Sequence, residues 1–308
     1  MSIDVLINEV GPRDGLQSQG KTLTVEQRLQ LIEALVVKAG LRAIEAGSFV
    51  SPKAVPQMAG TDQLFPRLPL ANQVAYSALV PNMKGYELAK AAGVRTFNVV
   101  LSATETMNQK NIGMSLEQTT VVCEQIMQRC KAEGMHGQAY VAVAYSCPFE
   151  GETSPTVVRQ LSEQMLDAGA GKIIIADTIG AANPRQVTDL LHDWVNDVGA
   201  ARISCHFHDT RGMALANVLA ALNEGVREFD SSIGGLGGCP FSPGASGNLA
   251  TEDLALMLES MGLNIGFPAM GLVPIVRLAE QLTGVQLGGH SFRWLARQVE
   301  QAERRADA

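Results

Sequence analysis

The sequence has 308 residues, of which 46% are hydrophobic and 18% are charged, and its net charge at pH 7 is −7. A (β/α)8 barrel needs about 250 residues, so one barrel and a short tail fit this length. No lysine- and arginine-rich cluster marks a nucleic-acid-binding face, and no apolar run reaches the roughly 20 residues of a membrane span. We therefore expect a globular protein that binds neither nucleic acid nor a membrane.

The cysteine content and the two ends of the chain indicate a cytoplasmic protein. There are five cysteines, an odd number, and no CxxC motif, which argues against a disulfide framework or a structural zinc site. The first residues, MSIDVLINEV, lack the basic segment and apolar stretch of a secretory signal. The final residues, ADA, are not a peroxisomal signal.

Eight short apolar runs predict eight β-strands. Several of them are apolar at consecutive positions, as expected of strands that are buried on both faces. The predicted strands span residues 5–10, 43–47, 73–80, 96–102, 140–146, 172–178, 202–209 and 228–233.

Helix signals lie between these runs. Two capping-box patterns and two proline-first patterns predict helix starts. They occur at Thr24/Gln27, Ser115/Gln118, Ser154-Pro155 and Asn183-Pro184. Alternating strands and helices predict a closed α/β (β/α)8 TIM barrel, which we take to be a single domain over residues 1–308 with a C-terminal helical cap from about residue 264. An open doubly wound sheet is the alternative, but the first strand is followed by GPRDGLQ, which is not a dinucleotide-binding glycine pattern.

The segment Cys205–Thr210, CHFHDT, is the strongest chemical signal in the sequence. Side chains alternate along a strand, so His206 and His208 should point to the same face at the end of the predicted seventh strand. Two such imidazoles can bind one divalent metal ion. A pair of buried or capping histidines would show the same pattern.

Polar residues after other strands support the metal interpretation. Arg13 and Asp14 follow the first strand, Glu45 ends the second, and Asn248 follows the eighth. In a closed barrel these strands and the seventh are neighbours, and active sites lie at their carboxyl ends. Asp14, His206, His208 and Asn248 would offer two oxygen and two nitrogen ligands, a set that suits Mg²⁺ or Mn²⁺. Taken alone, Arg13 and Asp14 could equally form a surface ion pair.

The glycine-rich segment 232–248 contains Cys239. A thiol in such a loop near a metal could act as an acid–base group, although an unreactive loop cysteine fits the sequence as well.

Together these motifs resemble the 3-hydroxy-3-methylglutaryl-CoA lyase family over roughly residues 3–262. The order and spacing of the motifs, rather than any single one, support the resemblance. They are EVGPRDGLQ, SFVSPKAVPQM, CPFEG, ADTIG, HFHDT, GLGGCP and ASGNLATED.

The resemblance implies a role for each matching residue. Asp14, His206, His208 and Asn248 match metal ligands, and Asp14 and His206 are also catalytic candidates. Arg13 matches the arginine beside the reacting carbonyl, Glu45 an active-site carboxylate and Cys239 the catalytic loop cysteine. Gln17 and Ser48 match pocket positions, and Phe149 lies in the CPFEG segment near the expected substrate pocket. Asn111, with Lys110, follows the fourth strand and is a candidate for binding CoA. A solvated loop without a binding role is an equally good interpretation of these two residues.

The resemblance further implies retro-Claisen cleavage of an acyl-CoA substrate, dependence on Mg²⁺ or Mn²⁺, and a homodimer or higher homo-oligomer. The sequence departs from the family pattern at Phe149, where the animal-type lyase has tyrosine, at Ile174, and at Ala46-Gly47 in place of two threonines. These departures leave the acyl group open among 3-hydroxy-3-methylglutaryl-CoA, citramalyl-CoA and a longer branched 3-hydroxyglutaryl-CoA. A condensing enzyme and a non-catalytic acyl-CoA-binding barrel are more remote alternatives.

Overall fold

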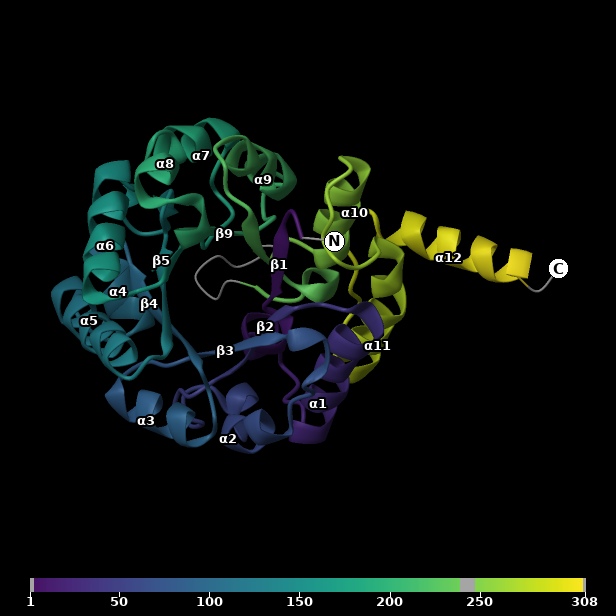
Figure 1. Ribbon diagram of the computed structural model, residues 1–308, viewed down its shortest axis with the longest axis horizontal. Helices are drawn as coiled ribbons and strands as arrows, with labels where there is room; N and C mark the ends of the chain where they lie inside the picture. The colour runs from purple at the N-terminus through teal and green to yellow at the C-terminus, as the bar shows by residue number, and fades with distance from the viewer. Residues whose placement is uncertain (1–2, 239–246, 307–308) are drawn as a thin grey trace.

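The computed structural model describes residues 3–238 and 247–306. Eight parallel strands form a closed barrel, in the spatial order β1-β10-β9-β8-β5-β4-β3-β2, as the sequence predicts (Figure 1). The barrel strands are β1 (Leu6–Glu9), β2 (Ala43–Ser48), β3 (Ala75–Leu79), β4 (Thr96–Ser102), β5 (His136–Ala142), β8 (Lys172–Asp177), β9 (Ile203–Phe207) and β10 (Glu228–Ser231). The short strands β6 (Ser146–Cys147) and β7 (Gly151–Glu152) form a separate antiparallel hairpin.

Helices surround the barrel (Figure 1). The α-helices are α1 (Val25–Glu33), α2 (Thr61–Leu64), α3 (Met83–Ala91), α4 (Glu105–Asn111), α5 (Leu116–Ala132), α6 (Pro155–Ala168), α7 (Pro184–Leu191), α8 (Trp194–Val198), α9 (Ala214–Asn223), α10 (Thr251–Ser260), α11 (Val273–Thr283) and α12 (Phe292–Ala306). The described residues also contain two π-helical segments, η1 (Gly11–Gly15) and η2 (Ala34–Ala39). They contain six 3₁₀ turns as well: η3 (Pro56–Met58), η4 (Phe65–Arg67), η5 (Ala71–Gln73), η6 (Ala200–Arg202), η7 (Ile233–Gly235) and η8 (Ala269–Leu272). The four helix starts indicated by the sequence are confirmed, including both capping boxes.

The fifth strand is displaced from its predicted position. It was expected at 140–146 but spans His136–Ala142, where it pairs with β4 from Thr96 to Ser102. Val143 ends the strand because its backbone has a positive φ of 51°, which β-branched residues rarely adopt. Beyond it, the chain leaves the barrel and forms the β6–β7 hairpin.

The barrel interior is polar at the level of the site, whereas the space between strands and helices is apolar. In β4, Phe97 faces outward, and its ring centroid lies 4.6 Å from that of Tyr86 in α3. The neighbouring Asn98 faces inward and binds Glu45 of β2. Strand alternation therefore separates a helix-packed core from a polar interior.

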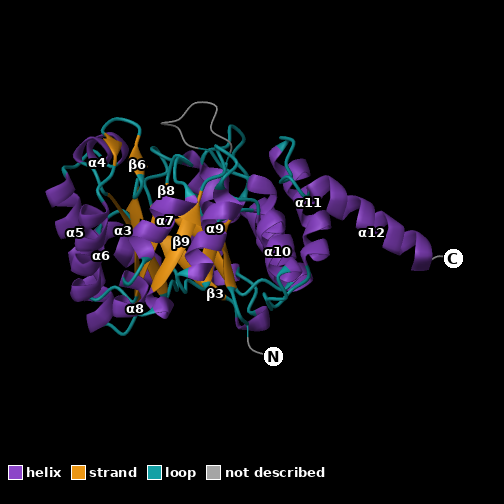
Figure 2. Cartoon of the chain, turned by 90° about the horizontal axis from the view of Figure 1, so that it is seen from above, coloured by secondary structure: helices purple, strands orange, loops and turns teal. Residues whose placement is uncertain are grey.

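The C-terminal helices lie beside the barrel, and α12 projects away from it (Figures 1 and 2). The segment that precedes α12 is attached to α10, because Asp253 accepts hydrogen bonds from the backbone N–H groups of His290 and Ser291 at 2.7 and 2.8 Å. Figure 2 shows α4 and β6 at one end of the barrel and the N-terminus at the opposite end. Among the described residues, no helix has both the length and the apolar character needed to cross a membrane.

Candidate functional site

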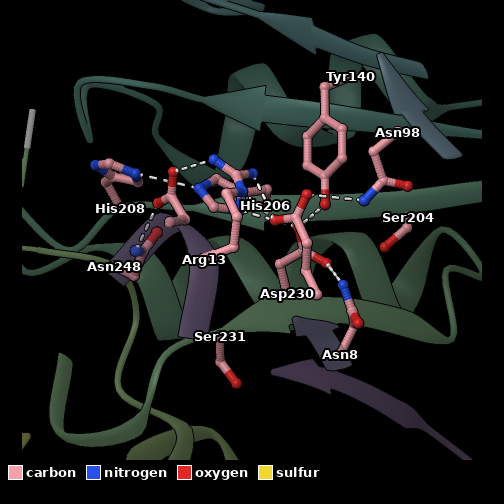
Figure 3. A network of polar contacts seen from close by, with 12 residues as sticks. Asn8, Arg13, Asn98, Tyr140, Ser204, His206, His208, Asp230, Ser231 and Asn248 are labelled. Carbon is pink, nitrogen blue, oxygen red and sulfur yellow. Dashed lines mark hydrogen bonds and ion pairs between the residues drawn. The ribbon is translucent and has the colours of Figure 1, made fainter. Parts of the chain in front are cut away.

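Three side chains able to bind a metal ion meet at the carboxyl end of the barrel. Two of them, His206 and His208, are labelled in Figure 3. Asp14 lies in η1, directly after β1, His206 lies in β9, and His208 immediately follows β9. One ligand atom from each of the three lies within 4.8 Å of the others. The two imidazoles are buried and face each other beside a carboxylate, an arrangement that favours the metal interpretation over a purely structural pair of buried histidines.

The spacing of the two histidines suits a shared cation. Their Nε2 atoms are 3.1 Å apart. Two ligands at right angles around an ion, each at the roughly 2.1 Å typical of Mg²⁺, lie about 3 Å from one another. Burial, followed by the charge of His206, lowers the pKa of His208 to about 4, so this ring is neutral at pH 7, as metal binding requires.

Asp230 of β10 fixes the orientation of His206. Its Oδ2 accepts hydrogen bonds from His206 Nδ1 at 3.0 Å and from the Tyr140 hydroxyl at 2.8 Å, and its Oδ1 accepts one from Asn8 Nδ2 at 2.8 Å. With Nδ1 donating to the carboxylate, the lone pair of His206 Nε2 is left for a metal. Although burial opposes it, the Asp230 contact raises the pKa of His206.

Sequence reasoning did not single out Asp230. The available signal was a carboxylate inside the predicted eighth strand, at a position where an apolar residue is expected. Asp230 and His206 are paired in the register between β10 and β9. Only knowledge of that register connects the carboxylate to the histidine.

Asn248 completes the group from the segment after β10. It forms an isolated antiparallel bridge with His208, and its Nδ2 donates to Asp14 Oδ2 at 2.8 Å and to the Leu236 carbonyl at 3.2 Å. Within the described part of the chain, Asn248 Oδ1 is buried without a hydrogen-bond partner. Such an oxygen costs about 1–3 kcal/mol, which coordination of a cation would offset. The donor set therefore fits a divalent metal ion.

The approach of the loop to Asn248 requires glycine at position 237. Its φ is 141°, and a Cβ atom there would lie 2.6 Å from Asn248 Nδ2. A larger residue would displace the amide from Asp14. Cys239, the thiol candidate in the same loop, lies outside the described residues.

Arg13 joins the metal-binding group to Glu45. Its Nε and Nη2 atoms both lie 2.5 Å from Glu45 Oε2, and its Nη1 lies 2.7 Å from Asp14 Oδ1. Arg13 is only 5% exposed, so the alternative of a surface ion pair is wrong. Although burial opposes the change, Arg13 and then the two histidines lower the pKa of Asp14 to about 2, which keeps this candidate ligand ionised. Burial raises the pKa of Glu45, against the opposing effect of Arg13.

A buried carboxylate, Glu9, connects the segments that position these residues. Its Oε1 accepts hydrogen bonds from the N–H groups of Gly11 and Ile233 at 2.8 and 2.9 Å, and its Oε2 accepts one from the Thr251 hydroxyl at 2.6 Å. It therefore links η1, η7 and the start of α10. Burial raises the pKa of Glu9 to about 7.

We expect the stability of the protein to fall as pH rises from about 4.5 to about 7 because of Glu9. In this window the folded carboxyl retains a proton that the unfolded one has released, so rising pH favours unfolding. The effect is about 3 kcal/mol, at about 1.4 kcal/mol per pH unit. Urea unfolding at several pH values should show a fall that is smaller by this amount in Glu9→Gln than in the wild type, because Glu252 and Asp177, whose pKa values burial also raises, contribute a fall of the same sign. An exposed control, Glu26→Gln, should follow the wild type, and identical pH dependence in Glu9→Gln would contradict the assignment.

The four substrate-binding candidates occupy two regions. Gln17 Nε2 donates to Asp14 Oδ1 at 3.2 Å, and Ser48 is buried at the end of β2. Phe149 lies in the turn between β6 and β7 and is 41% exposed, with Lys110 Nζ 5.2 Å from its ring centroid. Asn111 is exposed at the end of α4.

A cavity of about 800 Å³ borders the metal-binding group. It lies between the loops after β9 and β10 and the segment before α12, and its lining includes Asn248, Asp209, Asp253, His290 and Arg293. His290 Nε2 lies 3.1 Å from Asp209 Oδ2, so the C-terminal segment contacts the loop that follows His208. The cavity therefore reaches the candidate metal ligands at Asn248, whereas Asp14, His206 and His208 are not among its lining residues.

The fold and site together define a class of protein: a (β/α)8 barrel with a candidate metal centre at its carboxyl end and a buried Arg–Glu pair beside it. The HMGL-like family model matches residues 4–278, and the chain belongs to this family.

Individual relatives agree with this assignment. The chain is 43% identical to hydroxymethylglutaryl-CoA lyase of Pseudomonas mevalonii over 279 residues, covering 90% of this chain and 92% of that protein. It is 39% identical to (R)-citramalyl-CoA lyase of Chloroflexus aurantiacus over 279 residues, covering 87% and 88%. The crystal structure of hydroxymethylglutaryl-CoA lyase from Pseudomonas aeruginosa superimposes with a TM-score of 0.91 at 35% identity, covering 97% of this chain and all of that one.

Proposed function

We propose that this protein is a metal-dependent carbon–carbon lyase that cleaves 3-hydroxy-3-methylglutaryl-CoA to acetyl-CoA and acetoacetate. The main support is the buried Arg13 guanidinium, held by Glu45 and in direct contact with Asp14 of the metal-binding group. In this arrangement a fixed positive charge would lie beside a metal-bound substrate. The names of the relatives at 39–43% identity support an acyl-CoA thioester as the substrate class.

Asp14, His206, His208 and Asn248 would hold the ion. A bound Mg²⁺ or Mn²⁺ would orient the tertiary hydroxyl of the substrate and lower its pKa. A carboxylate or histidine near the metal would accept the hydroxyl proton.

The bond between carbons 2 and 3 then breaks, and its electron pair moves to the thioester as an enolate. Arg13 would stabilise the enolate oxygen, because its charge is already oriented before the reaction begins. By family resemblance, the Cys239 thiol would protonate carbon 2 of the enolate. Glu45 would hold Arg13 in place throughout.

Citramalyl-CoA is the second candidate substrate, and it would give acetyl-CoA and pyruvate. The similarity to (R)-citramalyl-CoA lyase supports this second substrate. So do Phe149 and the buried Ile174, two positions at which this sequence departs from the pattern of the lyase family. A longer branched 3-hydroxyglutaryl-CoA would use the same chemistry. A non-catalytic barrel is disfavoured, because an acyl-CoA-binding role alone does not require the buried Arg13–Glu45–Asp14 network.

Four further assignments belong to this proposal. Gln17, Ser48, Phe149 and Asn111 contact the acyl-CoA substrate. The chain acts as one barrel domain with the helices from about residue 264 as its cap. It assembles as a homodimer or higher homo-oligomer. It works in the cytoplasm.

The proposal predicts metal-dependent release of acetyl-CoA. The purified protein should cleave 3-hydroxy-3-methylglutaryl-CoA with Mg²⁺ or Mn²⁺ and form acetoacetate in equal amount, and EDTA should abolish the activity. Citramalyl-CoA and longer esters are assayed in parallel. If the protein strongly preferred one of these esters, the assigned substrate would change and the proposed mechanism would stand. Cleavage of none of the esters by metal-loaded protein would overturn the proposed function.

A further inference from the structure

Asn98, in the middle of β4, lies in the barrel interior and is fully buried (Figure 3). Its Nδ2 donates to Glu45 Oε1 at 2.8 Å and to Ser77 Oγ at 3.1 Å. The three residues belong to three adjacent strands, β2, β3 and β4, and Glu45 and Ser77 are direct partners in the strand register. Neither the sequence motifs nor the proposed mechanism includes Asn98.

The orientation of the Asn98 amide follows from its neighbour. Glu45 Oε2 already accepts from Arg13, and its other oxygen, Oε1, faces the Asn98 amide. Of the two polar atoms of that amide, only the nitrogen can donate a hydrogen bond, so Nδ2 points toward Glu45. Within the described residues, Asn98 Oδ1 is left buried without a partner. Such unpaired buried carbonyls are rare, so the fold retains an unfavourable group in order to direct a donor at Glu45.

The contact with Asn98 limits the motion of the Glu45 carboxylate. Arg13 contacts only one of its oxygens, Oε2, through two nitrogens. The last torsion of a glutamate has a broad energy profile, so a carboxylate held at one oxygen can rotate about that bond. A second hydrogen bond, at Oε1 from the adjacent side of the barrel, removes this freedom. The contacts then run without interruption from Asn98 through Glu45 and Arg13 to Asp14.

We infer that Asn98 is a positioning residue for the lyase reaction. It fixes the rotation of the Glu45 carboxylate and so keeps the Arg13 guanidinium aligned with Asp14 and with the substrate oxygen. The kinetic consequence rests on the proposed function, whereas the structural consequence does not. Asn98 touches no reacting atom and acts only through Glu45.

The kinetic test is Asn98→Leu, which keeps the approximate volume and removes the donor. We expect kcat to fall about tenfold or more and KM to change by less than about threefold, because misalignment of a catalytic group mainly affects the transition state. Asn217→Leu is the matched control. Asn217 in α9 is also fully buried, donates to the Ala182 carbonyl at 3.1 Å and has an unpartnered Oδ1, but it does not contact Glu45. This control should lose stability and keep its kcat.

A crystal structure of Asn98→Leu tests the structural consequence whether or not the protein is an active lyase. We expect the Glu45 carboxylate to rotate and Arg13 to lose one of its two carboxylate partners. Arg13 remaining within hydrogen-bond distance of both Glu45 and Asp14 would overturn the inference. So would equal kcat losses in the two leucine variants. An inactive wild type would refute the proposed function instead, and the crystal structure would still decide the role of Asn98.

Discussion

Replacing Arg13 by lysine is expected to lower kcat for acyl-CoA cleavage by about 10²- to 10³-fold and to change substrate affinity far less. Arg13 uses three nitrogens at once, Nε and Nη2 toward Glu45 and Nη1 toward Asp14. The single ammonium group of lysine cannot span both carboxylates. Steady-state kinetics together with a direct measurement of substrate binding would separate the two effects.

Arg28→Lys is the matched control for Arg13→Lys. Arg28 in α1 is also buried, but it donates to the Ala59 and Ala46 carbonyls and to the Thr61 hydroxyl rather than to carboxylates. This variant should lose stability and keep most of its kcat. If Arg13→Lys retained the wild-type turnover number, Arg13 would have no role in stabilising the enolate.

Replacing His206 by alanine is expected to weaken Mn²⁺ binding at least about a hundredfold and to remove activity. Loss of a partner that merely orients a ligand costs about 10–100-fold in metal affinity, so loss of the ligand itself should cost more. The substitution also removes the donor that Asp230 holds at 3.0 Å. Isothermal titration calorimetry with Mn²⁺ on the metal-free protein measures the effect directly.

His136→Ala provides the control for metal binding. His136 is exposed at the start of β5, at the opposite end of the barrel from the candidate metal centre. Its removal should leave Mn²⁺ affinity unchanged. Full retention of Mn²⁺ by His206→Ala would exclude His206 from the ligand set, whatever happened to the activity.

The fold followed from the sequence because its signals are local. Runs of consecutive apolar residues, capping boxes and prolines at helix starts predicted eight strand–helix units, and strand alternation placed His206 and His208 on one face. The one strand predicted at the wrong position, β5, shows the limit of this reasoning. The run 140–146 continues past Val143, whose positive φ ends the strand, and no feature of the apolar pattern marks that position.

The site was predictable only in part. Four segments that end neighbouring strands could be grouped once a closed barrel was assumed, and this brought Asp14, the two histidines and Asn248 together. Asp230, Glu9 and Asn98 escaped detection. Each is a polar residue in a buried strand whose partners are distant in the sequence. They lie on other strands for Asp230 and Asn98, and mainly in η7 and α10 for Glu9.

The amino-acid sequence by itself determined the barrel class, the candidate metal-binding side chains and the family, because these depend on periodicity and on motifs within short segments. Only the tertiary structure decided how the side chains are oriented. Strand register directs Asp230 to His206 Nδ1 and Asn98 to Glu45, while burial sets the protonation of His208 and makes Arg13 and Glu45 a desolvated pair. Hydrogen bonds between distant strands and the removal of water depend on three-dimensional packing, which no local pattern in the sequence encodes.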